Sequence, residues 1–278
     1  MPLRAVYFDL DGTLLDDDQR VPSALFPAIT RAQKRGWKVG IATGRRATTT
    51  LPYAEAIGVD APCVLFNGAR VTTSDLITPL FHTTLPRVSS LKVIRRVLQM
   101  EMYVGAYVDE RLLIDPRMPE PRSVTASAAL SARETVDLLE LEKAPVKLLF
   151  IDEPERLAEL RNVLITERLI PPGAHLVRSN PRFLELLPDG VNKATGLWRC
   201  AAHLGIDASE ILCFGDDEND REMLEVCGVG IAMAHAPDSV KEAADRVIAR
   251  EDIAAVLDEL TELTELTQQT TTASTPST

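Results

Sequence analysis

Two stretches of the sequence place several carboxylates directly after a short apolar run. In Phe8-Asp9-Leu10-Asp11-Gly12-Thr13-Leu14, Asp9 and Asp11 are two positions apart, so on extended backbone both side chains point to one side. In Phe214-Gly215-Asp216-Asp217-Glu218-Asn219-Asp220, four carboxylates and one amide occupy five positions. Carboxylates this close repel one another unless a cation lies between them, and oxygen ligands suit Mg²⁺. The alternatives are an ordinary Asp-Gly turn after a strand and an acidic helix N-terminus.

Two further elements could supply positive or hydrogen-bonding groups to a phosphate. Ile41-Ala42-Thr43-Gly44-Arg45 leads from an apolar run into a predicted helix, and free N–H groups at a helix N-terminus bind phosphate. Thr-Gly is also a common helix cap, and Arg45 can be a surface residue. Lys193 follows Asp189-Gly190-Val191-Asn192 at the start of another predicted helix. A lone lysine is usually solvated, but an ammonium is what a phosphate beside several carboxylates requires.

The elements that must position these residues follow an alternating α/β pattern. Short apolar runs predict strands at 5–8, 38–42, 63–66, 211–214 and 229–232, and helices are predicted at 22–36, 46–57, 192–204, 218–226, 237–244 and 251–260. Repeated β-α-β order predicts a parallel sheet covered by helices. Each chemical cluster then lies at the carboxyl end of a strand or at a helix start, where open α/β sheets bind ligands.

The pattern changes between about residues 82 and 187, where we expect an inserted α+β domain. Helices are predicted at 85–102 and 154–169, strands at 103–108, 111–114, 146–151, 175–178 and 183–187, and a loop rich in Pro, Ser and Ala at 116–129. The expected division is therefore a core at 1–81 and 188–262, and an inserted domain at 82–187. Residues 263–278 form a Thr-rich tail with few bulky apolar residues, for which we expect disorder.

Composition limits the partners and the compartment. The chain has 278 residues, 45% of them hydrophobic, and a formal net charge of −11, so its overall field disfavours nucleic acid and anionic membranes. The basic residues of 85–102 are then best interpreted as a solvated helix face. No apolar run approaches the length of a membrane span, and the start lacks the zones of a secretory signal. The four cysteines show no CxxC spacing and the four histidines are scattered, so we expect a cytoplasmic protein without a zinc site.

In combination, these motifs resemble those of the haloacid dehalogenase (HAD) superfamily, and within it the Cof-type sugar-phosphatase subfamily. The four motifs of that superfamily match, in order, Asp9-Leu10-Asp11-Gly12-Thr13-Leu14, Thr43-Gly44-Arg45, Lys193 and Gly215-Asp216-Asp217-Glu218-Asn219-Asp220. Phe66-Asn67-Gly68-Ala69 and Phe183-Leu184-Glu185-Leu186-Leu187-Pro188 also look typical of the subfamily. The similarity spans Arg4 to about Leu260. It implies a Rossmann-like parallel-sheet core with an α+β cap domain of type IIB in the inserted segment.

The resemblance also implies a mechanism. Asp9 would be the nucleophile that forms an aspartyl-phosphate, and Asp11 would protonate the leaving alcohol and then activate water. Mg²⁺ would be bound by Asp9, Asp216 and the backbone carbonyl of Asp11, with Asp220 orienting its waters. The groups that bind the phosphate would be Leu10, Thr43, Gly44, Lys193 and Asn219.

The implied partner is a small phosphate ester, such as a sugar phosphate, while the oligomeric state is not readable from the sequence. Two alternatives keep the same fold. One is a phosphohexomutase, in which a phosphorylated Asp11 returns the group to a sugar. The other is a non-catalytic phosphate-binding protein, although such a protein would be expected to have lost Asp9, Asp11 or Lys193. The presence of Asp11 favours a phosphatase or a mutase over a dehalogenase.

Overall fold

The central sheet of the protein is parallel, as the sequence predicts. The computed structural model describes residues 2–118 and 133–273. Five strands lie side by side in the order β14-β13-β12-β1-β2, and every neighbouring pair is parallel. Their bounds are β1 Ala5–Phe8, β2 Lys38–Ile41, β12 Ile211–Gly215, β13 Val229–Met233 and β14 Arg246–Ile248. This sheet places the carboxyl ends of β1, β2 and β12 next to one another.

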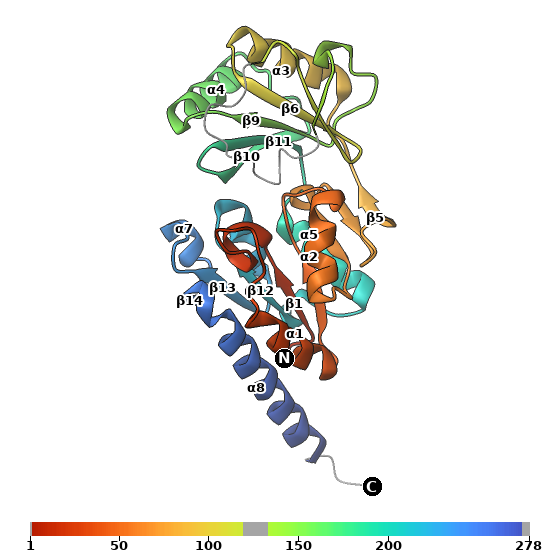
Figure 1. Ribbon diagram of the computed structural model, residues 1–278, viewed down its shortest axis with the longest axis vertical. Coiled ribbons are helices and arrows are strands. Elements are labelled where there is room, and N and C mark those ends of the chain that lie inside the picture. Colours follow the sequence, from red (N-terminus) through yellow and green to blue (C-terminus); the bar gives the residue numbers. More distant parts are fainter. Residues whose placement is uncertain (1, 119–132, 274–278) are drawn as a thin grey trace.

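Helices cover both faces of this sheet, which explains why its strands are nearly continuous apolar runs. All four residues of β1 are buried, with Val6 and Phe8 in one core cluster and Ala5 and Tyr7 in another. Figure 1 shows the helices packed around the sheet. The helices of the core are α1 Leu25–Lys34, α2 Ala47–Ile57, α5 Lys193–Leu204, α6 Arg221–Val226, α7 Asp238–Lys241 and α8 Ile253–Ala273.

The predicted strand at 63–66 does not join the parallel sheet. β3 (Cys63–Leu65) forms a separate antiparallel sheet with β4 (Arg70–Thr72) and β5 (Pro79–His82), and the link to the core is an isolated parallel bridge from Ala42 to Val64. The chain reverses after Leu65, because Phe66 and Asn67 both take left-handed backbone angles, with φ of 50° and 53°.

A six-stranded mixed sheet, which we call the cap sheet, is formed between residues 103 and 188. Its order is β10-β11-β9-β6-β7-β8, and its strands are β6 Tyr103–Val108, β7 Arg111–Ile114, β8 Arg133–Thr135, β9 Lys147–Ile151, β10 Ala174–Asn180 and β11 Phe183–Pro188. Helices α3 (Arg87–Gln99) and α4 (Pro154–Thr166) pack on the face directed away from the core (Figure 1). The loop predicted at 116–129 lies, from residue 119 onward, outside the described residues.

The expectation of a disordered tail is wrong for residues 263–273, because α8 continues to Ala273. The hydroxyls of Thr261 and Thr264 are accommodated inside the helix by donating to the carbonyls of Leu257 and Leu260, at 2.6 and 2.8 Å. Both threonines are buried. Residues 274–278 lie outside the described part of the chain. Within the described part, no helix is both long and apolar enough to span a bilayer.

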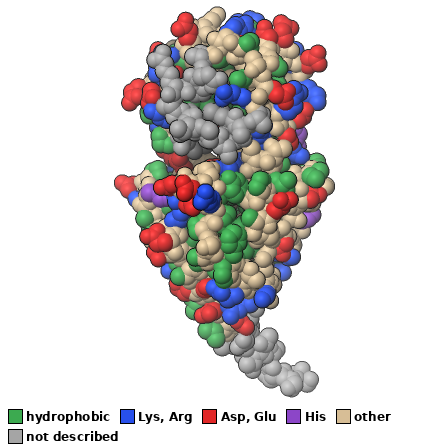
Figure 2. All heavy atoms as spheres, viewed as in Figure 1, with side chains coloured by type: hydrophobic (Ala, Val, Ile, Leu, Met, Phe, Trp, Pro, Cys, Tyr) green, Lys and Arg blue, Asp and Glu red, His purple; other side chains and the backbone are tan. Residues whose placement is uncertain are grey.

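Charged side chains are mixed on the molecular surface. On the face drawn in Figure 2, Lys and Arg side chains are interspersed with acidic ones over both the cap and the core. Apolar side chains gather on the core, below its junction with the cap. The described residues on this face therefore form no continuous basic patch.

Candidate active site

Three of the predicted clusters meet at the carboxyl edge of the central sheet. β1 and β12 pair in register with Phe8 opposite Phe214, so Asp9 and Asp216 leave the sheet close together. Lys193, the first residue of α5, places its Nζ 2.5 Å from Asp9 Oδ1 and 2.6 Å from Asp220 Oδ1. Asp9, Lys193 and Asp220 are all buried. Segments that are about 180 residues apart in the chain thus form one charged cluster.

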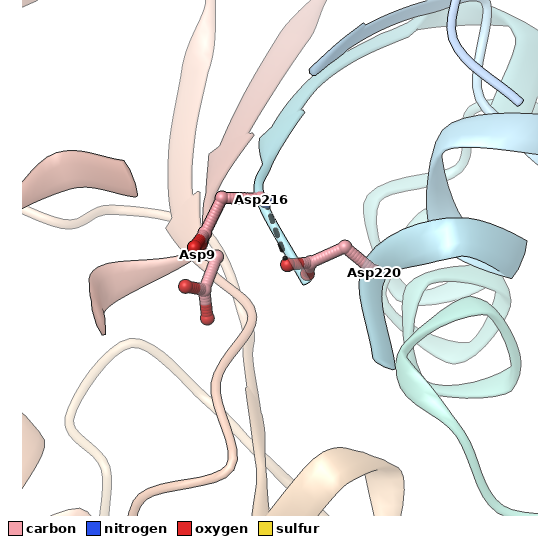
Figure 3. Close-up of side chains that lie close together, drawn as sticks. All are labelled: Asp9, Asp216 and Asp220. Atoms are coloured by element: carbon pink, nitrogen blue, oxygen red, sulfur yellow. Dashed lines mark hydrogen bonds between the residues drawn. The ribbon is translucent and has the colours of Figure 1, made fainter. Parts of the chain in front are cut away.

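Three carboxylates of this cluster could hold a metal ion. One oxygen from each of Asp9, Asp216 and Asp220 lies within 4.8 Å of the others, and Figure 3 shows these side chains lying close together. Asp216 is oriented by Thr13, whose hydroxyl donates to Asp216 Oδ1 at 2.7 Å. Asp220 Oδ2 accepts from the backbone N–H groups of Asp216 and Asp217, at 3.0 and 3.2 Å. An all-oxygen donor set suits a hard divalent cation.

The pKa values of Asp9, Asp216 and Lys193 are shifted, because charged groups are crowded together in a buried site. Burial raises the pKa of Asp9 well above its ordinary value, although the ammonium of Lys193 opposes the shift. Burial, together with the charge of Asp220, raises the pKa of Asp216 to about 6. Burial alone would lower the pKa of Lys193, but Asp220 and Asp9 raise it above its ordinary value. A cation among the carboxylates would stabilise their charged forms.

Asp11 lies outside the carboxylate cluster and is paired with Arg45. Its side chain is 54% exposed, whereas that of Arg45 is buried. Arg45 Nε donates to Asp11 Oδ2 at 2.6 Å, Nη2 donates to the other carboxylate oxygen and to Gln19, and the guanidinium lies over the ring of Tyr53. The interpretation of Arg45 as a surface residue is therefore wrong. A bidentate pair of this kind fixes the direction of the carboxylate.

The predicted phosphate-binding residues lie around the same edge. Thr43 and Gly44 follow β2, the neighbour of β1, and Thr43 is buried. Asn219 donates from Nδ2 to Asn67 Oδ1 at 3.0 Å. Gly44 packs against that amide, since a Cβ at Gly44 would be 3.0 Å from Asn67 Oδ1. Leu10 is buried in the turn that follows Asp9.

Three polar residues near the site had no predicted role. Asn67 Nδ2 donates to Glu185 Oε2 at 2.9 Å, and Glu185 pairs with Lys147 at 2.8 Å. Asn67 and Glu185 belong to the two stretches typical of the subfamily. The sequence signal for Lys147 and Glu185 is a single charged residue within an apolar strand.

A cavity of about 420 Å³ opens beside Lys193, between core and cap. Asn67, Lys193 and Asn219 line it from the core, and His175 and Arg178 line it from β10 of the cap sheet. The cavity therefore offers space, next to the charged cluster, for a small polar molecule.

Gly12 is required where the first motif approaches the fourth. It has a φ of +84°, and a Cβ there would lie 2.2 Å from Asp216 Oδ2. We expect Gly12→Ala to displace Asp216 and to lower kcat/KM by about 100-fold, as a shift of about 1 Å can do. Gly36→Ala is the matched control, because Gly36 also has a positive φ, +87°, but nothing lies within 4 Å of its Cβ position. It should cost only about 1–2 kcal/mol of unfolding free energy. Equal kinetics in the two variants would contradict the prediction.

The family of the chain follows from comparison with known proteins. A family model described as haloacid dehalogenase-like hydrolase matches residues 6–260. The chain belongs to this family. Its fold is also that of the HAD hydrolases: a solved HAD subclass IIB sugar phosphatase superposes with a TM-score of 0.78, at 23% identity, over 92% of this chain and 98% of that one. The predicted α/β fold with an additional cap is thereby confirmed.

Several relatives of the chain are named phosphatases. The 5-amino-6-(5-phospho-D-ribitylamino)uracil phosphatase of Bacillus subtilis is 29% identical over 89% of this chain and 92% of its own length. The HMP-PP phosphatase of Cronobacter sakazakii is 30% identical over 82% of this chain and 83% of its own length. These comparisons confirm the predicted enzyme class, a phosphatase of the HAD family.

Proposed function

We propose that the protein is a Mg²⁺-dependent phosphatase that hydrolyses small phosphate monoesters, sugar phosphates or similar metabolites, through an aspartyl-phosphate at Asp9. The observation that carries the proposal is the meeting of Asp9, Asp216, Asp220 and Lys193 at one sheet edge, with the carboxylate oxygens within 4.8 Å. The relatives add support, since their names describe phosphatases of small phosphorylated molecules. The division into a core at 1–81 and 188–262 and a cap at 82–187 is part of the same proposal.

Asp9 is the proposed nucleophile. Its carboxylate oxygen attacks phosphorus, the bond from phosphorus to the ester oxygen breaks, and Asp11 gives a proton to the leaving alcohol. Water then attacks the phosphorus of the aspartyl-phosphate, the bond from phosphorus to the Asp9 oxygen breaks, Asp11 takes a proton from the water, and inorganic phosphate leaves. Because Arg45 donates to both Asp11 oxygens, the Asp11 carboxyl has to leave this ion pair and carry a proton before it can protonate the alcohol.

The metal site follows from the donor set. Asp9, Asp216 and the backbone carbonyl of Asp11 would hold Mg²⁺, and Asp220 would orient its waters while also anchoring Lys193. When bound, the ion neutralises charge on the transferring phosphoryl oxygens. The groups that would bind those oxygens are Thr43, Gly44, Lys193, Asn219 and the N–H of Leu10. Their hydrogen-bond donors and the positive charge of Lys193 would stabilise the negative charge of the phosphoryl group in the transition state.

We expect chelation to abolish activity. In EDTA no metal ion offsets the negative charge of Asp9, Asp216 and Asp220, and these carboxylates then repel the phosphate of the substrate. Phosphate release should therefore fall to background, and added Mg²⁺ should restore it. The measurement is phosphate release from a panel of phosphate esters, with hexose phosphates also followed for isomerisation. Full turnover in chelator would overturn the metal assignment, and isomerisation without phosphate release would identify a mutase.

A further inference from the structure

A buried ion pair lies on the face of the cap sheet that is directed to the core. Lys147 on β9 and Glu185 on β11 are each 3% exposed, and their charged groups are 2.8 Å apart. Apolar and aromatic side chains surround them on this face, including Tyr107 and Leu149. A buried ion pair is seldom more stabilising than an apolar pair of similar size. Stability alone therefore does not account for these charges.

The ammonium of Lys147 contacts the core as well as the cap. Its Nζ donates to the carbonyl of Gly44 at 2.9 Å and lies 4.9 Å from the centre of the Tyr107 ring. Gly44 belongs to the second motif, which is proposed to bind phosphate. A charge carried by the cap is thus bonded directly to the backbone of the phosphate-binding segment.

The carboxylate of Glu185 determines the direction of two amides. A carboxylate can only accept hydrogen bonds, so Asn67 must turn its Nδ2 toward Glu185, at 2.9 Å. Asn67 Oδ1 is then turned to Asn219, whose Nδ2 donates to it at 3.0 Å. One of the two N–H groups of the Asn219 amide is used in this bond, which leaves the other to donate to a phosphate oxygen.

We propose that Lys147 and Glu185 are positioning residues, carried by the cap, that hold Gly44 and the Asn219 amide in the direction needed to bind the transferring phosphoryl group. The inference rests on the proposed phosphatase function. The two contacts to the core, Lys147 to Gly44 and Glu185 to Asn67, come from adjacent strands and form together when the cap lies on the core. The phosphate site is then complete only while these contacts between cap and core are made.

The test replaces both charges at once, so that neither is left buried alone. In Lys147→Met/Glu185→Leu, we expect kcat for p-nitrophenyl phosphate with Mg²⁺ to fall about 10- to 100-fold. KM should change less than about twofold, because the lost interaction is made in the transition state. In an Asn219→Ala background the same exchange should cause a smaller further loss, because the part that acts through that amide is already gone and only the part through Gly44 remains. The matched control is Arg96→Met/Glu167→Leu, which removes an exposed cap pair at 2.8 Å and should keep wild-type kinetics.

Several outcomes would overturn the proposal. Wild-type kcat in the folded double variant would show a structural pair only, and a rise in KM alone would indicate direct contact with the leaving group. Fully multiplicative losses with Asn219→Ala would also contradict it. If the double variant does not fold, Glu185→Gln keeps the size of the side chain and the Lys147 bond to Gly44 but allows the amides to flip, and should show the part of the kcat loss that acts through Asn219.

A second readout separates this inference from the proposed function. The affinity for orthovanadate, a mimic of the five-coordinate transition state, measured by calorimetry without turnover, should fall about tenfold in the double variant and fall less when Asn219 is already alanine. An unchanged affinity would count against the inference even if no ester proved to be a substrate. Conversely, loss of activity in Asp9→Asn would support the phosphatase whatever the result for Lys147 and Glu185.

Discussion

Replacing Asp9 by asparagine should leave a folded protein whose phosphate release is slower by about 10⁴-fold or more, as for the loss of other nucleophiles. The amide is nearly isosteric with the carboxylate, and its oxygen can still accept the bond from Lys193 Nζ that the carboxylate accepts at 2.5 Å. What it lacks is the charge that attacks phosphorus. The measurement is the single-turnover and steady-state release of phosphate from p-nitrophenyl phosphate, together with the melting temperature of the variant.

The control for this variant is Asp238→Asn, which makes the same chemical change on a side chain that is 96% exposed. It should release phosphate at the wild-type rate. Rapid release by Asp9→Asn, with the asparagine verified by mass spectrometry to be intact, would exclude Asp9 as the nucleophile. A variant that is inactive but unfolded would be replaced by Asp9→Ser, for which the same loss is expected.

The convergence of the site could be predicted because the sheet is parallel. Asp9 and Asp216 each follow an apolar run, and parallel strands bring their carboxyl ends to one edge. The register of Phe8 with Phe214 then places the two carboxylates side by side. The place of Lys193 is harder to predict from the sequence, because it depends on where α5 begins. Its helix start is fixed locally by Asn192, which accepts from the N–H of Thr195 at 2.8 Å.

Three other features, namely the pairing of β3, the burial of Arg45 and the length of α8, depend on contacts that the periodicity of the sequence does not encode. β3 pairs with β4 because the chain reverses at Phe66 and Asn67, which both take left-handed angles, and this conformation is common for Asn but not for Phe. Arg45 is buried because Asp11 and the Tyr53 ring receive its guanidinium. The threonines of α8 satisfy their hydroxyls within the helix, which composition alone does not show.

The second large effect is expected from Lys193→Met, on both activity and stability. The change leaves Asp9 and Asp220 buried without their shared cation, and removing one partner of a buried pair costs about 3–5 kcal/mol. In the transition state it also removes a donor to the phosphoryl oxygens, worth about 10²- to 10³-fold in kcat. Unfolding by urea in EDTA and phosphate release with Mg²⁺ measure the two losses separately.

The dependence of this stability loss on Mg²⁺ tests whether the carboxylates of the cluster share one electrostatic site. If the ion binds among Asp9, Asp216 and Asp220, it supplies part of the positive charge that Lys193→Met removes, so the variant should gain more stability from Mg²⁺ than the wild type does. Asp220→Asn in the same background should also restore stability by removing one uncompensated charge. Lys143→Met is the control: it breaks a Lys–Asp pair of 2.9 Å whose lysine is 70% exposed, and such pairs contribute about 0–1 kcal/mol. An equal response of Lys193→Met and Lys143→Met to Mg²⁺ would mean that the ion binds elsewhere, because only a cation within the cluster can replace the buried ammonium.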